Sequence, residues 1–176
     1  YRVDYDRPKS IGRVRSFLGN FGMMVRAYTY IRELGPEGLR GVSDMAVLNS
    51  RYIAARLAPV LPIAFPTPSL HEAVFTDREL EAETGVKTLD LAKRLIDYGF
   101  HPPTVYFPLV VRGALMIEPT QTETKQTLDS FVDAVTAIVR EAKETPELVK
   151  GAPHSTRHRR LDEARAARQP RLRWTS

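Results

Sequence analysis

Residues Gly99 to Glu123, GFHPPTVYFPLVVRGALMIEPTQTE, hold the side chains best suited to chemistry. His101 is followed by Pro102 and Pro103, which keep the preceding backbone out of the helical region, so the imidazole sits on a stiffened loop. An imidazole held in this way can move a proton or bind a substrate near neutral pH. The same residue can equally fill the turn after a helix, and the local pattern does not choose between these roles.

Three other candidates also have a structural alternative. Glu118 precedes Pro119 and either acts on a substrate or, as we favour, satisfies a buried arginine or a loop backbone. Tyr106 is expected on a strand, where a half-buried core position with the hydroxyl at the rim is the commoner role. His71 and Glu72 are expected on opposite faces of a strand, so no acid–base pair is predicted between them.

Arg13 and Arg15 precede a helix start at Asn20 and could bind a carboxylate or phosphate with help from the helix N-terminus. Exposed or interface arginines are the commoner case. No metal-ligand spacing stands out, because His154 and His158 are four residues apart but follow a proline among arginines. The ten glycines are scattered and form no phosphate-binding loop.

A lysine that forms an imine needs desolvation or a cationic neighbour to lower its pKa. Each of the six lysines is expected in a polar segment, a turn or an exposed helix end. They are Lys9, Lys87, Lys93, Lys125, Lys143 and Lys150. The sequence therefore predicts no imine-forming lysine in this chain.

Apolar residues at helical spacing predict four main helices. The first three are bounded by Asn20 and Gly35, by Pro36 and Pro59, and by Thr88 and Gly99. The fourth follows a capping box formed by Thr120 and Glu123. It has the strongest apolar stripe, which consists of Leu128, Phe131, Val132, Val135, Ile138 and Val139.

Four short extended runs alternate with these helices, at about residues 61–65, 70–76, 104–107 and 115–118. The order of elements predicts an α+β domain with helices packed on a short, mostly antiparallel sheet of about four strands. Residues 1–150 are expected to form the domain, and 151–176 a linker and a basic tail. Within that tail, Leu161 to Arg168 is expected to form a short docked helix, because it has helix formers and opposite charges three or four residues apart.

The 176-residue chain is long enough for one domain with its own core. Its net charge of +5 lies in the tail, which contains seven arginines and two acidic residues. The formal charges of residues 1–153 sum to zero. Nucleic-acid binding by the body is therefore not expected. There is no cysteine and no apolar run of the ~20 residues that a membrane span needs, so we expect a soluble, cytoplasmic protein without membrane contact.

Several motifs resemble glycine decarboxylase, the P-protein of the glycine cleavage system. They are Gly99-Phe100-His101-Pro102-Pro103-Thr104, Phe107-Pro108 and Leu115-Met116-Ile117-Glu118-Pro119-Thr120, preceded by His71-Glu72 and by the segment from Leu89 to Tyr98. The start of the chain (Arg7 to Phe17) and its tail (Arg160 to Arg168) resemble the second subunit of the two-subunit form. Gln121 departs from the family, which usually has an acidic residue there.

The resemblance implies the C-terminal domain of a fold-type I enzyme that depends on pyridoxal phosphate. Such an enzyme decarboxylates glycine and transfers the aminomethyl group to the lipoyl arm of the carrier H-protein. The lysine that binds pyridoxal phosphate lies upstream of the matched region in this family. The implied partners are therefore the N-terminal part of the enzyme, a sister subunit and the H-protein, and the chain is not expected to be active alone.

By the same resemblance, His101 and Thr104 are expected to line the pocket for glycine or the lipoyl arm, with His71, Tyr106 and Glu118 as further contacts. Arg13, Arg15 and Asn20 are candidates for the cofactor phosphate. No residue of this chain is assigned a catalytic step or a metal. A second hypothesis is a non-catalytic α+β module that docks a partner through its arginine-rich tail.

Overall fold

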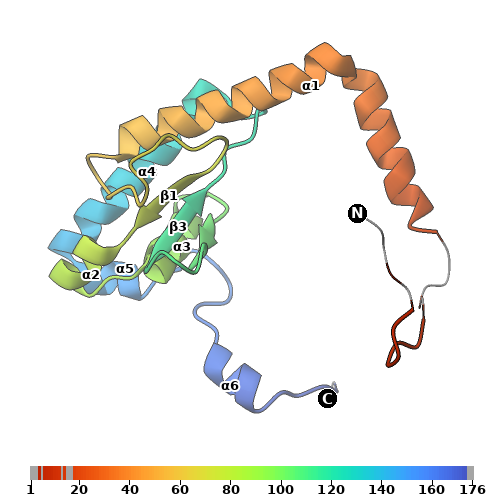
Figure 1. Cartoon of the computed structure of the whole chain (residues 1–176). Coiled ribbons are helices and arrows are strands. Elements are labelled where there is room, and N and C mark those ends of the chain that lie inside the picture. Colours follow the sequence, from red (N-terminus) through yellow and green to blue (C-terminus); the bar gives the residue numbers. More distant parts are fainter. Residues whose placement is uncertain (1–3, 5, 13, 15–17, 174–176) are drawn as a thin grey trace. The chain divides into compact units, whose positions relative to one another are not determined.

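The structure is a computed structural model that describes residues 4, 6–12, 14 and 18–173. It divides into two compact units, residues 1–40 and 41–176 (Figure 1).

Helix α1 (Phe21–Leu57) begins in the first unit and ends in the second. Asn20 caps it, since its Oδ1 accepts a hydrogen bond of 3.3 Å from the Met23 amide. Gly35 has φ 61° and ψ −175°, so it separates two helical segments, and Pro36 starts the second. The two predicted helices and their boundary are thus confirmed.

The apolar residues of the first segment of α1 are largely exposed within the described part of the chain, because no other element of the first unit packs on them. Tyr28 is 65 % exposed and Phe21 76 %. The other large apolar side chains that are exposed here are Met23, Met24, Val25, Tyr30 and Ile31.

The second unit is built on a three-stranded antiparallel sheet with the order β1-β3-β2. The strands are β1 (Ala73–Thr76), β2 (Thr104–Val105) and β3 (Ala114–Ile117). Ala73 pairs with Ile117, and Thr104 pairs with Met116 on the other side of β3. The α+β class is confirmed.

The prediction of about four strands was wrong, because the run near residues 61–65 forms only an isolated bridge between Ile63 and Phe75. The Ala64 amide donates to Val74 O at 2.8 Å, and the Thr76 amide donates to Pro62 O at 3.0 Å. Proline has no N–H for a ladder, so Pro62 and Pro66 limit the pairing to this short stretch.

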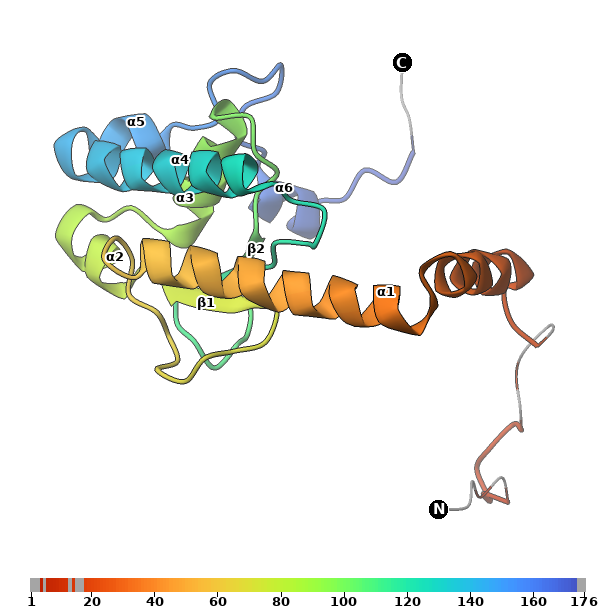
Figure 2. The ribbon, with the colours of Figure 1, turned by 90° about the horizontal axis from the view of Figure 1, so that it is seen from above.

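The remaining helices are α2 (Arg78–Thr84), α3 (Thr88–Asp97), α4 (Lys125–Glu144), α5 (Pro146–Lys150) and α6 (Glu163–Arg168). Figure 2 shows α3, α4 and α5 gathered together, and these three helices contact one another. The whole predicted stripe of α4 is buried in the core, as predicted.

The two faces of the sheet are covered differently. Phe75 and Leu115 lie on the face that joins the main core with Ile53, Leu57 and α4. Val74, Ala114 and Met116 form a smaller apolar cluster with the partly buried Ala64 and Val111. Helices therefore cover one face, while loops cover the other.

The helix ends were predicted with mixed success. Gly99, at φ 83°, ends α3 with bonds from its own amide to Ile96 O and from the Phe100 amide to Leu95 O, which confirms the left-handed turn. Thr88 was expected to cap α3, but it is the first helical residue, and the Lys87 amide donates to the Asp90 carboxylate at 2.8 Å.

The capping box of Thr120 and Glu123 was also wrong. Helix α4 starts later, with Thr124 as its cap, and Thr124 Oγ1 accepts from the Thr127 amide at 3.1 Å. Thr120 instead belongs to a turn, in which the Glu123 amide donates to Thr120 O. Both threonines offer a capping hydroxyl, so local sequence alone does not distinguish them.

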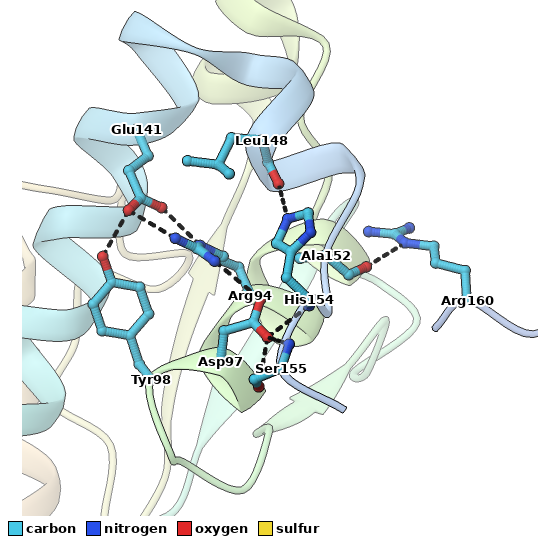
Figure 3. A network of polar contacts seen from close by, with 9 residues as sticks. All are labelled: Arg94, Asp97, Tyr98, Glu141, Leu148, Ala152, His154, Ser155 and Arg160. Carbon is cyan, nitrogen blue, oxygen red and sulfur yellow. Dashed lines mark hydrogen bonds and ion pairs between the residues drawn. The ribbon is translucent and has the colours of Figure 1, made fainter. Parts of the chain in front are cut away.

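The residues after α5 run along α3 (Figure 3). Asp97 Oδ1 accepts hydrogen bonds of 2.7 Å from the amides of His154 and Ser155 and one of 2.8 Å from Ser155 Oγ. Arg160 pairs with the Asp90 carboxylate at 2.7 Å and donates to Ala152 O at 2.7 Å. The segment expected to be a linker is therefore fixed to the domain as far as Arg160.

Beyond Arg160 the predicted tail helix is present as α6, which Asp162 caps through the Arg165 amide at 3.0 Å. No residue of α6 is buried, so this helix does not pack on the domain in the described chain, and what it docks on stays a prediction.

Candidate functional site

A cleft of about 380 Å³ lies between α1, the loop after α3, the end of β3 and the start of α4. It belongs entirely to the second unit. Its lining residues are Ile53, Phe100, His101, Pro102, Pro103, Thr104, Met116, Glu118, Pro119, Glu123, Thr127, Leu128 and Phe131.

The floor of the cleft is apolar and buried. Ile53, Met116, Leu128 and Phe131 are buried, with 2 to 8 % of their surface exposed. The Phe131 ring meets the Phe100 ring edge to face, with centroids 5.3 Å apart and planes at 87°. A floor of this kind binds hydrocarbon rather than charge.

The rim of the cleft is polar. His101, Thr104 and Glu118 were predicted from separate motifs, and the structure brings all three to this rim. They come from the loop after α3, from β2 and from the residue after β3, because β2 and β3 are paired next to that loop. All three side chains are exposed, so they are available to a ligand.

Asn49 holds one wall of the cleft and was not predicted. This buried residue of α1 donates from Nδ2 to Thr120 O at 2.9 Å, which ties the turn after Glu118 and Pro119 to the helix. The two residues are 71 positions apart, so the only local signal was an asparagine within a helical apolar pattern.

His71 and Glu72 depart from the prediction, because β1 begins only at Ala73 and strand alternation does not apply to them. Their side chains face each other, with 3.5 Å between His71 Nε2 and Glu72 Oε1. Glu118 joins them, and one ligand atom from each of the three lies within 4.8 Å of the others. These are the residues that could hold a metal ion, yet all are at least partly exposed, and such groups commonly occur without one.

Tyr106 does not line the cleft, although it directly follows β2. It has φ 57°, the only non-glycine residue with positive φ in the described part of the chain. Burial raises the pKa of its hydroxyl, and the nearby Asp77 and Asp90 carboxylates raise it further, while a contact to the Leu89 backbone lowers it. The hydroxyl therefore lies near the start of α3.

The expected cofactor contacts belong to the first unit and not to the unit that holds the cleft. Arg13 and Arg15 lie outside the described residues, and Asn20 belongs to the first unit, where its side chain caps α1.

None of the six lysines, all of them described, is among the residues that line the cleft. Lys125 pairs with Asp129 at 2.6 Å, and this hydrogen bond raises the pKa of the amine rather than lowering it. Lys143 pairs with Glu83, and Lys87 with Glu81. The residues that line the cleft therefore do not fit covalent attachment of pyridoxal phosphate.

Asp77 fixes the hairpin that carries β2 and β3. Only 2 % of its surface is exposed, and its Oδ2 accepts from the Thr88 amide at 2.7 Å. Thr88 Oγ1 lies 2.8 Å from the same oxygen and 2.7 Å from Gly113 O. The start of α3, the end of β1 and the hairpin therefore meet at one buried carboxylate.

A comparison with known families shows which protein family contains this cleft. The model of the glycine dehydrogenase C-terminal domain matches residues 42–159, a range that contains every residue lining the cleft. The chain belongs to this family. The resemblance stated from the motifs is thus confirmed.

Among individual relatives, the chain is similar to the second subunit of glycine dehydrogenases. A probable glycine dehydrogenase (decarboxylating) subunit 2 from Halalkalibacterium halodurans is 58 % identical over 99 % of this chain and 36 % of its own length. The protein of the same name from Caldanaerobacter subterraneus subsp. tengcongensis is 57 % identical over the same shares. That from Bacillus velezensis is 56 % identical over 97 % of this chain and 35 % of its own length. The chain thus spans about a third of the length of these relatives.

Among the described helices, none is both long enough and apolar enough to cross a membrane.

Proposed function

We propose that this glycine dehydrogenase domain forms one wall of the pocket in which glycine is decarboxylated and its aminomethyl group is passed to the lipoyl arm of an H-protein. The observation that carries the proposal is the cleft, in which a polar rim of three family-motif residues stands over an apolar floor. The printed name of the relatives, glycine dehydrogenase (decarboxylating) subunit 2, supports the reaction.

The chemistry of the cleft suits the two proposed ligands. The Glu118 carboxylate can accept from an ammonium group, while the His101 imidazole and the Thr104 hydroxyl can donate to a carboxylate. The floor formed by Ile53 and Phe131 suits the methylenes of a lipoyl arm. His71, which lies beside Glu118, is proposed as a further contact to the ligand.

Pyridoxal phosphate, when bound, would supply the electron sink for loss of carbon dioxide. Its lysine is proposed to lie in the part of the relatives' length that this chain does not span, because no lysine here lines the cleft. Arg13, Arg15 and Asn20 are proposed to contact the cofactor phosphate.

The first segment of α1 supports a larger assembly as well. A single helix that exposes Phe21, Tyr28 and Ile31 presents apolar surface that would be covered in a complete enzyme. We propose that the upstream part of the enzyme, together with a sister subunit, covers it.

Reconstitution tests the proposal. The chain is mixed with pyridoxal phosphate and glycine, first alone and then with the upstream part and the companion subunit, and imine absorbance and exchange of labelled carbon dioxide into glycine are measured. We expect exchange only in the complete mixture. Imine formation and release of carbon dioxide by the chain alone would overturn the proposal, as would capture of a partner without any exchange.

Matched variants then test the cleft itself. Thr104→Val removes a hydroxyl from the rim, while Thr136→Val removes one from the outer side of α4. In the complete mixture we expect His101→Asn and Thr104→Val each to lower exchange about tenfold, equivalent to ~1.4 kcal/mol. Thr136→Val should leave exchange unchanged, and equal losses in both threonine variants would count against the cleft.

A further inference from the structure

Residues 161–173 form an arm that the domain itself leaves uncovered. Every residue from Leu161 to Arg173 is exposed. The arm begins at a fixed point, because Asp97 holds His154 and Ser155 while Asp90 holds Arg160. Asp90 and Asp97 are seven residues apart on α3, so the preceding segment is fastened at two places two turns apart.

The arm contains a helix that lacks support from the rest of the chain. Helix α6 has six residues and no buried side chain, whereas isolated helices shorter than about 12 residues are marginal in water. The Asp162 cap satisfies a backbone amide at the start of the helix, but it does not supply tertiary packing. A fixed anchor followed by a prepared, uncovered helix is the arrangement of a segment that becomes ordered against a partner.

The side chains of the arm define the chemistry of that partner. All its cations are arginines, and Arg165 and Arg168 lie three residues apart on one face of α6. The guanidinium group binds carboxylates in bidentate fashion and is enriched in protein interfaces. Within the described residues, the only ion pair of an arginine from 157–173 is that of Arg160, which precedes the arm.

Two leucines favour a protein over a nucleic acid. Leu161 is 69 % exposed and Leu172 is 90 % exposed, at the two ends of the arm. Apolar side chains contribute to a protein interface but not to a phosphate backbone. The body of the domain also carries no net charge that would attract a polyanion, since the formal charges of residues 1–153 sum to zero.

From these observations we infer that residues 161–173 are a docking arm for an acidic, partly apolar surface on the companion subunit of the enzyme. The inference rests on the proposed function for the identity of the companion, which the name subunit 2 of the relatives implies. Arg165 and Arg168 bind its carboxylates, and Leu161 and Leu172 contact apolar surface beside them.

The test measures binding of the complete subunit that contains this domain to its companion subunit, by calorimetry at 50 and 300 mM NaCl. Arg165→Glu/Arg168→Glu reverses two charges on the arm. Arg51→Glu/Arg78→Glu makes the same change at two exposed positions of the body. We expect the arm variant to weaken binding at least tenfold at 50 mM NaCl and less at 300 mM, and the body variant to bind within twofold of wild type.

Variants of the two leucines provide a second, independent test. Leu161→Ala/Leu172→Ala should weaken binding of the companion about fivefold at both salt concentrations. Neither double variant should shift the thermal midpoint of the domain, because all four residues are exposed. Arm variants that bind the companion as wild type does would overturn the inference. So would tighter binding of a 20-base-pair DNA or RNA duplex than of the companion at 150 mM NaCl.

Glycine–carbon dioxide exchange in the same mixtures, at saturating companion, separates this inference from the proposed function. Exchange by wild type and normal binding by the arm variants would refute the arm alone. Binding that depends on the arm without any exchange by wild type would refute the proposed function alone.

Discussion

Asp97 offers the sharpest test of what fixes the C-terminal segment to the domain. Burial alone would raise the pKa of its carboxyl group, but hydrogen bonds from Ser155, His154 and Arg94 outweigh burial and lower the pKa from 3.8 to about 2. Only 6 % of the side chain is exposed, so solvent screens these contacts little. The shift corresponds to about 2 kcal/mol of folding free energy, at ~1.4 kcal/mol per pKa unit.

The pH dependence follows from the direction of the shift. Since the pKa is lower in the folded chain, the stabilisation is complete above pH 3.8 and is lost as the pH falls toward 2. Asp97→Asn should therefore lower the free energy of unfolding by about 2 kcal/mol at pH 7, and the difference from wild type should vanish near pH 2. Asp133→Asn, at an exposed position on α4, should differ from wild type by less than about 0.5 kcal/mol.

Urea unfolding at pH 7, 5, 4, 3 and 2, followed by circular dichroism, measures these differences. Trypsin cleavage after Arg157 supplies a local measurement, because loss of the bonds from Asp97 to His154 and Ser155 frees that segment. A difference in unfolding free energy between Asp97→Asn and wild type that stays the same from pH 7 down to pH 3 and 2 would refute the reasoning. So would a gap no larger than that of Asp133→Asn.

Two further changes test the framework of the cleft. Gly113→Ala should lower the unfolding free energy by at least about 2 kcal/mol in urea titrations, because Gly113 has φ 63° and a Cβ there would lie 1.6 Å from Asp77 Oδ1. Gly41→Ala, in a helix with nothing within 4 Å of the new Cβ, should instead raise it by roughly 0.5–1 kcal/mol; equal losses at both glycines would contradict this account. Asn49→Ala should lower the unfolding free energy by about 1–3 kcal/mol, because it leaves the buried side of Thr120 O without its donor, and an unchanged urea midpoint would show that the bond is dispensable.

The elements with strong local patterns were predictable from sequence. The stripe of α4 recurs at helical spacing over about three turns, and Gly99 marks a left-handed end that few other residues accept. The rim of the cleft was reached through the family motifs, which name His101, Thr104 and Glu118 without showing that they meet.

What the sequence did not show depends on contacts between distant residues. Thr120 and Thr124 are equally good caps, and the bond from Asn49 to Thr120 O holds the first of them in a turn, so that α4 begins after the second. His71 and Glu72 were assigned to opposite faces because a strand was assumed to include them. The strand begins only at Ala73, after both residues, and both side chains lie near Glu118.

The floor and the rim of the cleft differ in how much they contribute to the stability of the domain. The cleft floor, which includes Ile53, Leu128 and Phe131, is continuous with the main core, so changes there alter folding as well as the pocket. His101 and Thr104 are exposed at the rim, where substitution leaves the core intact. Loss of exchange in rim variants can therefore be assigned to the pocket, whereas the same loss in a floor variant requires a measurement of stability before it says anything about the reaction.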